Sequence, residues 1–103
     1  MEIKTNRNGN EFIVAPEGEI NILTAPELEE TINSGIEGIE LLTMDFKECD
    51  YVSSAGLRVL LATFKTLKNN KAKMRLINVG ENFTEVLENT GLDSVFDIVQ
   101  NGD

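Results

Sequence analysis

Residues 45–61 read DFKECDYVSSAGLRVLL, and they join the end of one apolar run to the start of another. Residues 39–46 are strongly apolar on both faces, which predicts a central, buried strand. From Ser54 to Asn69 the apolar residues recur at helical spacing and predict an amphipathic helix. Its inward stripe is expected to consist of Leu57, Leu60, Leu61, Phe64 and Leu67. A buried strand followed by a turn and such a helix is typical of an α/β fold.

The turn delivers two adjacent serines, Ser53 and Ser54, to the start of the predicted helix. Four backbone N–H groups at a helix start lack a partner within the helix, and the helix dipole adds positive potential there. A serine in this place acts as an N-cap, worth about 1 kcal/mol, or as a phosphoacceptor whose phosphate meets the free N–H groups. A phosphate would leave the helix intact but expel a partner packed over it. Spacing alone leaves both interpretations open.

The residues before this stretch predict a hairpin, a further short strand and a first helix. Asn8-Gly9-Asn10 separates extended runs over residues 2–7 and 11–17, a pattern typical of a type I′ turn. A short third extended piece is expected over residues 20–23. Thr24 would then begin a helix through a T-x-x-E capping box with Glu27. The inward residues of that helix are expected to be Ala25, Leu28 and Ile32, and its stop Gly35 and Gly38.

The residues after the central helix complete the predicted sheet. Residues 73–79 predict a strand and residues 95–99 an edge strand. Between them, residues 81–90 predict a short helix that ends at Gly91, with Phe83, Val86 and Leu87 inward. The elements follow the order β-β-β-α-β-α-β-α-β. This order predicts an α/β fold, a mixed β-sheet with amphipathic helices packed on it, in a single domain over residues 1–103.

The charge of the chain limits the partners it can bind. Its 103 residues include nine Lys and Arg against eighteen Asp and Glu, which gives a net charge of -9. Nonspecific binding to nucleic acid or to anionic membrane needs a positive surface, so we expect neither. Every apolar run falls short of the roughly 20 residues of a membrane helix, and residues 1–10 are polar and unlike a signal peptide. We therefore expect a cytoplasmic protein without membrane insertion, monomeric when free.

Missing residue types argue against catalysis and against cofactors. The chain has no histidine, so it holds no Ser-His-Asp or Cys-His arrangement and no imidazole metal ligand. Its single cysteine, Cys49, is expected to be a small, mostly buried residue rather than a reactive thiol. Asp45, Glu48 and Asp50 match no known metal-binding loop and are expected to form a solvated strand end. We expect neither an enzyme nor a bound metal or cofactor.

Three motifs in order resemble a known family. Residues 18–21 read GEIN and are followed by TAPEL at 24–28, similar to the family's G-E-[IL]-D and T-A-x-x-L. Residues 51–61 read YVSSAGLRVLL, similar to [FY]-[IM]-D-S-[ST]-G-L-x-x-L, and residues 88–92 read ENTGL, similar to the closing [TS]-G-L. The chain resembles a STAS domain, specifically a free-standing anti-sigma factor antagonist, over nearly its whole length.

The resemblance implies a partner-switching cycle. Antagonists of this family bind an anti-sigma factor that is also their serine kinase, and so free a sigma factor. Phosphorylation of one serine releases the antagonist, and a phosphatase, expected to be of the PP2C type, restores it. When the G-L of the motif is aligned, Ser54 falls on the phosphorylated serine, with Ser53 as the alternative. The implied partner-binding residues are Asn21, Ile22, Leu23, Thr24, Ser53, Ser54, Gly56 and Arg58.

Two residues depart from the family pattern and keep a second interpretation open. Ser53 and Asn21 stand where the motifs have aspartate, which removes two carboxylates near the implied phosphoacceptor. Either the kinase partner differs or phosphorylation is slow or absent. The alternative function is a STAS structural subunit of a bacterial phospholipid-transport ABC complex, in which the same helix would clamp an ATPase without phosphorylation.

Charge is also distributed unevenly along the chain. Residues 51–80 hold six Lys and Arg and no Asp or Glu, a charge of +6. The other 73 residues hold the remaining three cations and all eighteen acids, a charge of -15, so the two parts sum to -9. Two interpretations are open: lysines on a solvated helix face, or a surface that complements an acidic groove on a protein partner.

Overall fold

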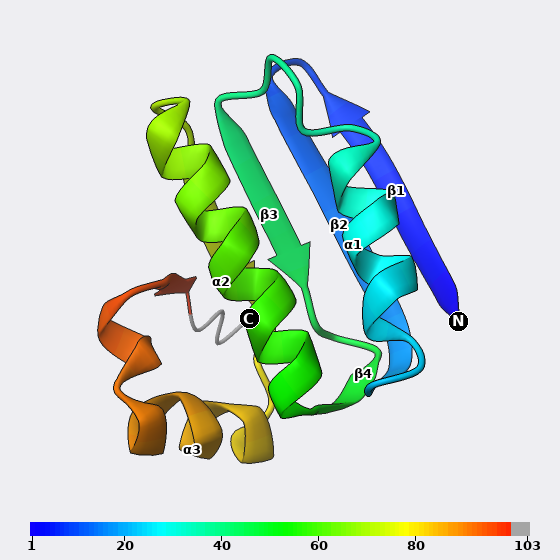
Figure 1. The fold of residues 1–103 in the computed structure, drawn as a ribbon, viewed down its shortest axis with the longest axis vertical. Coiled ribbons are helices and arrows are strands. Elements are labelled where there is room, and N and C mark those ends of the chain that lie inside the picture. The colour runs from blue at the N-terminus through cyan, green and yellow to red at the C-terminus, as the bar shows by residue number, and fades with distance from the viewer. Residues whose placement is uncertain (100–103) are drawn as a thin grey trace.

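The computed structural model describes residues 1–99, which form a mixed sheet and three α-helices (Figure 1). The order of strands in the sheet is β1-β2-β3-β5-β6, and β4 pairs with β2 beyond the end of β3. β1 and β2 are antiparallel, and all other pairs are parallel. The elements are β1 (Glu2–Asn8), β2 (Glu11–Ile20), α1 (Ala25–Asn33), β3 (Leu41–Asp45), β4 (Cys49–Val52), α2 (Ser54–Asn69), β5 (Lys73–Ile77), α3 (Glu81–Thr90), a 3₁₀ turn (Leu92–Ser94) and β6 (Asp97–Val99). The predicted fold class is confirmed.

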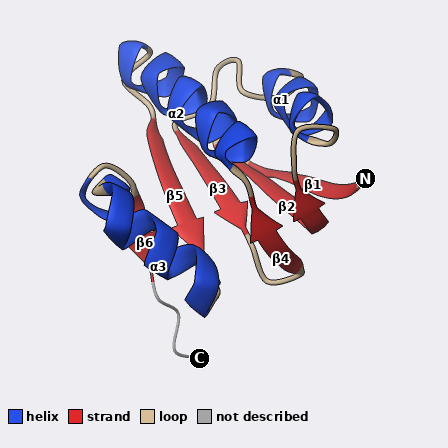
Figure 2. Ribbon diagram, turned by 60° about the horizontal axis from the view of Figure 1, so that its bottom comes forward, coloured by secondary structure: helices blue, strands red, loops and turns tan. Residues whose placement is uncertain are grey.

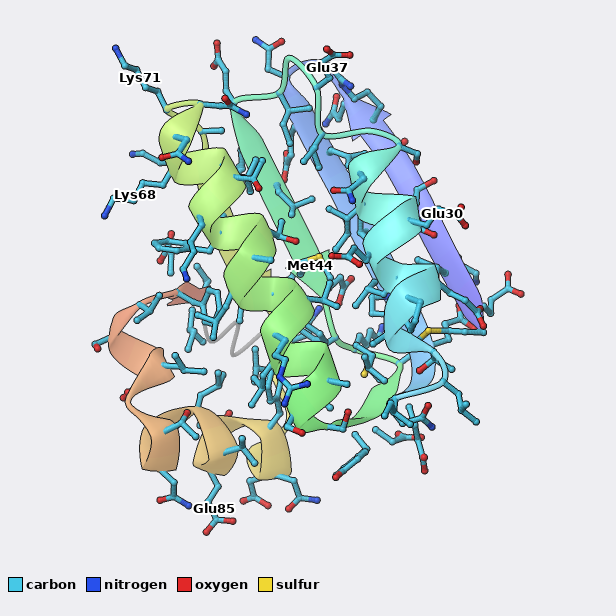
Figure 3. The ribbon with its side chains drawn as sticks, in the orientation of Figure 1. Glu30, Glu37, Met44, Lys68, Lys71 and Glu85 are labelled. Atoms are coloured by element: carbon cyan, nitrogen blue, oxygen red, sulfur yellow. The ribbon has the colours of Figure 1, made fainter. Side chains whose placement is uncertain are left out.

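The core lies between the sheet and the pair of helices α1 and α2, which cover one of its faces (Figure 2). Met44 of the central strand lies beneath these helices and is fully buried (Figure 3). Leu28 of α1 and Leu60 of α2 are fully buried as well. Helix α3 lies at the end of the sheet where β3 finishes, and Phe83 packs edge-to-face on Phe46 with ring centroids 5.1 Å apart.

Helix α2 has the predicted bounds, but its buried face is turned relative to the predicted stripe. Leu60 and Leu67 are buried as expected, whereas Leu57, Leu61 and Phe64 are only half-buried. The rest of the buried face consists of smaller residues: Gly56, Val59 and Thr63. Since α2 contacts α1 as well as the sheet, its small residues are needed on the side where the packing is tightest.

The third extended piece predicted over residues 20–23 is wrong. Strand β2 runs on to Ile20 and is followed by a turn, while the additional strand is β4, after β3. β4 pairs in parallel with the end of β2, and a bulge at Gly18 (φ +93°) adjusts the register. β4 has only four residues, and Asp50 and Tyr51 within it are exposed. Its extended conformation therefore depends on a partner distant in sequence, which local pattern does not reveal.

The hairpin is present, but its turn is not the predicted type I′. Strand β1 extends to Asn8, opposite Glu11, so that Gly9 and Asn10 are the two turn residues. Gly9 has φ +64°, whereas Asn10 does not have a positive φ. Positive φ at the first turn residue alone is typical of type II′, which favours glycine at that position.

The predicted capping box at the start of α1 is also wrong. Thr24 is the N-cap residue but makes no side-chain cap bond, and its own φ and ψ are helical. The carboxylate of Glu27 instead pairs with the amino group of Met1 at 3.1 Å. Helix α1 ends at Asn33, before the two predicted stop glycines. Gly35 is needed for packing, since a Cβ there would lie 2.5 Å from the ring of Phe12.

We expect Gly56→Ala to destabilise the fold by about 1–3 kcal/mol, although alanine is the better helix former. A Cβ at this position would lie 2.7 Å from Ile20 Cγ2 and 2.8 Å from Val52 Cγ1, so α2 would have to move away from β2 and β4. Urea denaturation measures the difference. Asn69→Ala, at the exposed end of the same helix, is the control, and an equal stability of the two variants would contradict the close packing.

Candidate functional site

The pairing of β4 with the end of β2 brings two separate parts of the sequence together. Ile20 lies beside Val52 in the sheet, and the N–H of Ser53 donates to the carbonyl of Ile20 at 2.8 Å. The chain leaves both strands at this point. The loop of residues 21–24, here called the docking loop, therefore lies next to the start of α2. The site residues implied by the two motifs are brought together by the fold.

The docking loop is held by its own polar side chains. Asn21 Oδ1 accepts hydrogen bonds from the backbone N–H groups of Leu23 (2.9 Å) and Thr24 (3.1 Å). Thr24 Oγ1 accepts from the N–H of Asn21 (2.8 Å) and donates to the carbonyl of Glu19 (2.9 Å). Both side chains are half-buried, and their hydrogen bonds to the backbone fix the conformation of the loop.

This loop conformation exposes large apolar side chains. Ile22 and Leu23 are 77% and 79% exposed, and Tyr51 of the neighbouring strand β4 is 54% exposed. The other exposed large apolar residues within residues 1–99 are Val95 and Val99, and each is less than 40% exposed. Exposed apolar residues gathered at one place on a domain are typical of a protein-binding surface. Ile22 and Leu23, two of the implied partner-binding residues, are therefore accessible to a partner.

The two serines at the start of α2 differ in their surroundings. Ser53 is the N-cap: its backbone is extended (φ -83°, ψ 177°), and its Oγ accepts from the N–H of Gly56 at 3.4 Å. Ser53 is half-buried. Ser54 is the first residue of α2 and is exposed, and its hydroxyl has no hydrogen-bond partner within residues 1–99. The cap interpretation therefore applies to Ser53, and the hydroxyl of Ser54 is left accessible.

Gly56 and Arg58 complete the predicted set, with different roles. Gly56, expected among the partner-binding residues, is buried against Ile20 and Val52, where the absence of a side chain permits close packing. Arg58 is exposed one helical turn after Ser54 and forms no ion pair within the described chain. The first turn of α2 holds no acidic residue that would oppose an anion there.

The groups around the site show no sign of a nucleophile or metal centre. Burial raises the pKa of the Cys49 thiol, the charge of Asp50 raises it further, and backbone hydrogen bonding at Tyr51 and Ile20 lowers it only in part. This thiol stays protonated at neutral pH. Asp45 Oδ1 accepts from the side chain of Asn78 at 2.9 Å. In residues 1–99, His, Cys, Asp and Glu side chains form no group of three that could hold a metal ion.

The family model described as "STAS domain" matches residues 2–102 of the chain. The chain belongs to the STAS domain family. The Bacillus subtilis (strain 168) protein named "Anti-sigma-B factor antagonist" is similar to this STAS domain, with 32% identity over 98 residues, 95% of this chain and 88% of the relative. The fold resemblance to solved structures extends over almost the whole chain. No helix within residues 1–99 is long and apolar enough to cross a membrane.

Two solved structures place this STAS domain among known folds. An anti-sigma factor antagonist from Mycobacterium paratuberculosis shares 25% sequence identity and has a TM-score of 0.87, covering 99% of this chain and 87% of its own. The Bacillus cell fate determinant SpoIIAA in its phosphorylated form has a TM-score of 0.76 at 14% identity, covering 97% of this chain and 93% of its own. At that identity SpoIIAA shows likeness of fold alone.

We expect Ser53→Ala to destabilise this STAS domain by about 1 kcal/mol, because the N–H of Gly56 loses its cap. Ser54→Ala is the matched control, and its stability should stay within about 0.5 kcal/mol of the parent because no bond is lost. Thermal denaturation of both variants decides this. A greater loss for Ser54→Ala than for Ser53→Ala would contradict the assignment of the cap.

Proposed function

We propose that this STAS domain is an anti-sigma factor antagonist. It acts as a binding protein rather than an enzyme: it binds an anti-sigma factor through the docking loop and the start of α2, and thereby frees a sigma factor. The carrying observation is the exposed, unbonded hydroxyl of Ser54 beside a loop that exposes Ile22 and Leu23. The name of the Bacillus subtilis relative and the Mycobacterium structure support this proposal.

The apolar residues supply the binding energy in this proposal. Burying a leucine or isoleucine side chain contributes about 1.5–3 kcal/mol, and Ile22 and Leu23 are almost fully available for it. The internal hydrogen bonds of Asn21 and Thr24 hold the loop in place before binding, so little conformational entropy is lost when a partner docks. Tyr51 adds an aromatic side chain of the kind that is enriched at protein interfaces.

Phosphorylation of Ser54 ends the complex. A phosphoserine adds close to two negative charges, and the free N–H groups and dipole at a helix start tolerate them, so the domain stays folded. The same phosphate covers the docking surface with bulk and charge, and a closely packed partner is expelled. A protein of the same fold, SpoIIAA, is described in a phosphorylated form, which supports the proposal by analogy.

Of the two adjacent serines, Ser54 is the better acceptor. The hydroxyl of Ser53 is engaged with the N–H of Gly56, and a kinase would have to break this cap to reach it. Asn21 supplies an acceptor oxygen where the motif has aspartate, so the loop does not need a carboxylate to keep its shape. The substitutions at 21 and 53 therefore affect charge at the surface and leave its architecture unchanged.

The kinase in this cycle is the anti-sigma factor itself, and a PP2C-type phosphatase removes the phosphate. The alternative, a structural subunit of a phospholipid-transport ABC complex, would use the same surface without a phosphorylation step. The relatives reported above carry the name of antagonists, which favours the cycle.

The direct test is incubation with the cognate anti-sigma factor and ATP, followed by mapping of phosphate by mass spectrometry. We expect phosphate on Ser54 in the parent and in Ser53→Ala, and none in Ser54→Ala, which should still form the complex. Phosphorylated protein should elute apart from the anti-sigma factor in gel filtration. Absence of phosphate at both serines, together with no complex, would overturn the proposal.

A further inference from the structure

The exposed side of α2 carries a row of positive charges along its length. Ser54, Arg58, Leu61, Lys65 and Lys68 follow one another at spacings of four, three, four and three residues, which places them along one side of a helix. Arg58, Lys65 and Lys68 are exposed, and they are called the basic stripe below. From Ser54 to Lys68 the row extends about 21 Å at ~1.5 Å per residue.

No ion pair within residues 1–99 neutralises the basic stripe. Among residues 1–99 the ion pairs are Met1–Glu27, Lys4–Glu17 and Arg75–Asp97, and none includes a residue of the stripe. Figure 3 shows Lys68 on the side of α2 that faces away from α1, and Glu30 on the far side of α1. Glu30 therefore lies away from the stripe, and Glu27 of the same helix is paired with the amino group of Met1.

The composition makes this arrangement notable. Acids outnumber bases by eighteen to nine in the whole chain, yet residues 51–80 contain six bases and no acid. A solvated helix in so acidic a chain is expected to mix both signs, because interspersed opposite charges support each other at i,i+4 spacing. A surface of single sign beside a proposed binding site is typical of electrostatic recognition of a partner.

We propose that the basic stripe binds an acidic segment of the protein partner that docks at Ser54. This inference rests on the proposed function and extends it. The partner has its apolar contact at the docking loop and a run of Asp and Glu that follows α2 toward Lys68. A short acidic protein segment fits better than nucleic acid, because a longer polyanion would meet the -15 charge carried by the other residues.

The stripe also links recognition to the phosphorylation step. Ser54 stands at its amino-terminal end, one helical turn from Arg58. A phosphate there pairs with the same cation that the acidic segment uses, and it repels that segment directly. Contacts at the solvated edge of an interface act mainly on the rate of association, so the stripe is expected to speed docking and to make it dependent on salt.

Two charge-matched double variants test the inference. Lys65→Gln/Lys68→Gln removes two charges from the stripe, and Lys4→Gln/Arg7→Gln removes two from β1 on a distant part of the sheet. The probe is a synthetic peptide of alternating Glu and Ala, with a Gln and Ala peptide as its control, titrated against the ¹⁵N-labelled protein by NMR. We expect shifts at the amides around the stripe, lost at about 0.5 M salt and weakened about 5- to 10-fold in the stripe variant only.

The cognate anti-sigma factor gives the second measurement. Its association rate, followed by stopped flow, should fall about 3- to 10-fold for the stripe variant and stay unchanged for the β1 variant. Equal rates and equal peptide affinities for the two variants would overturn the inference while leaving the proposed function intact. Shifts of the stripe amides by a duplex DNA as strong as those by the Glu peptide would also overturn it. Failure of the parent protein to bind the anti-sigma factor, with the peptide results as expected, would refute the proposed function alone.

Discussion

The parallel pairing of β4 with the last residues of β2 is the contact on which the proposed docking surface depends. It sets Ser53 against the carbonyl of Ile20 and fixes where the chain leaves both strands. The first turn of α2 then rests on Ile20 and Val52, because Gly56 has no side chain to hold it away. One short ladder of hydrogen bonds and one glycine thus determine how the docking loop and Ser54 are placed relative to each other.

This arrangement separates structural and functional roles between neighbouring residues. Ser53 caps α2 while Ser54 presents a free hydroxyl, and Asn21 and Thr24 hold the loop while Ile22 and Leu23 are exposed. A modification at Ser54 can therefore change the surface without removing a bond that the fold needs. Such a separation suits regulation by charge at an interface, because the phosphorylated domain would stay folded and could bind again once the phosphate is removed.

Strongly periodic segments were predictable from sequence, and features that depend on distant contacts were not. The bounds of α2 follow from its repeating apolar residues, whereas β4 has only four residues and is extended because β2 lies beside it. The T-x-x-E pattern predicted a capping box, but the side chain of Thr24 is engaged elsewhere. Thr24 Oγ1 accepts from the N–H of Asn21, and Asn21 Oδ1 accepts from the N–H of Thr24. Adjacent serines look alike in a sequence, and the extended backbone of Ser53 alone makes it the cap. The docking loop was predicted from the resemblance of the chain to a family and not from a local sequence pattern.

Amide hydrogen exchange with and without the cognate anti-sigma factor tests the central claim most directly. If the β2–β4 pairing builds a single docking surface, binding should slow exchange in residues 20–24 and in residues 52–57 together, at the same partner concentration. Phosphorylated protein should show neither change. Protection of one segment without the other, or protection confined to β1 or α3, would contradict the account.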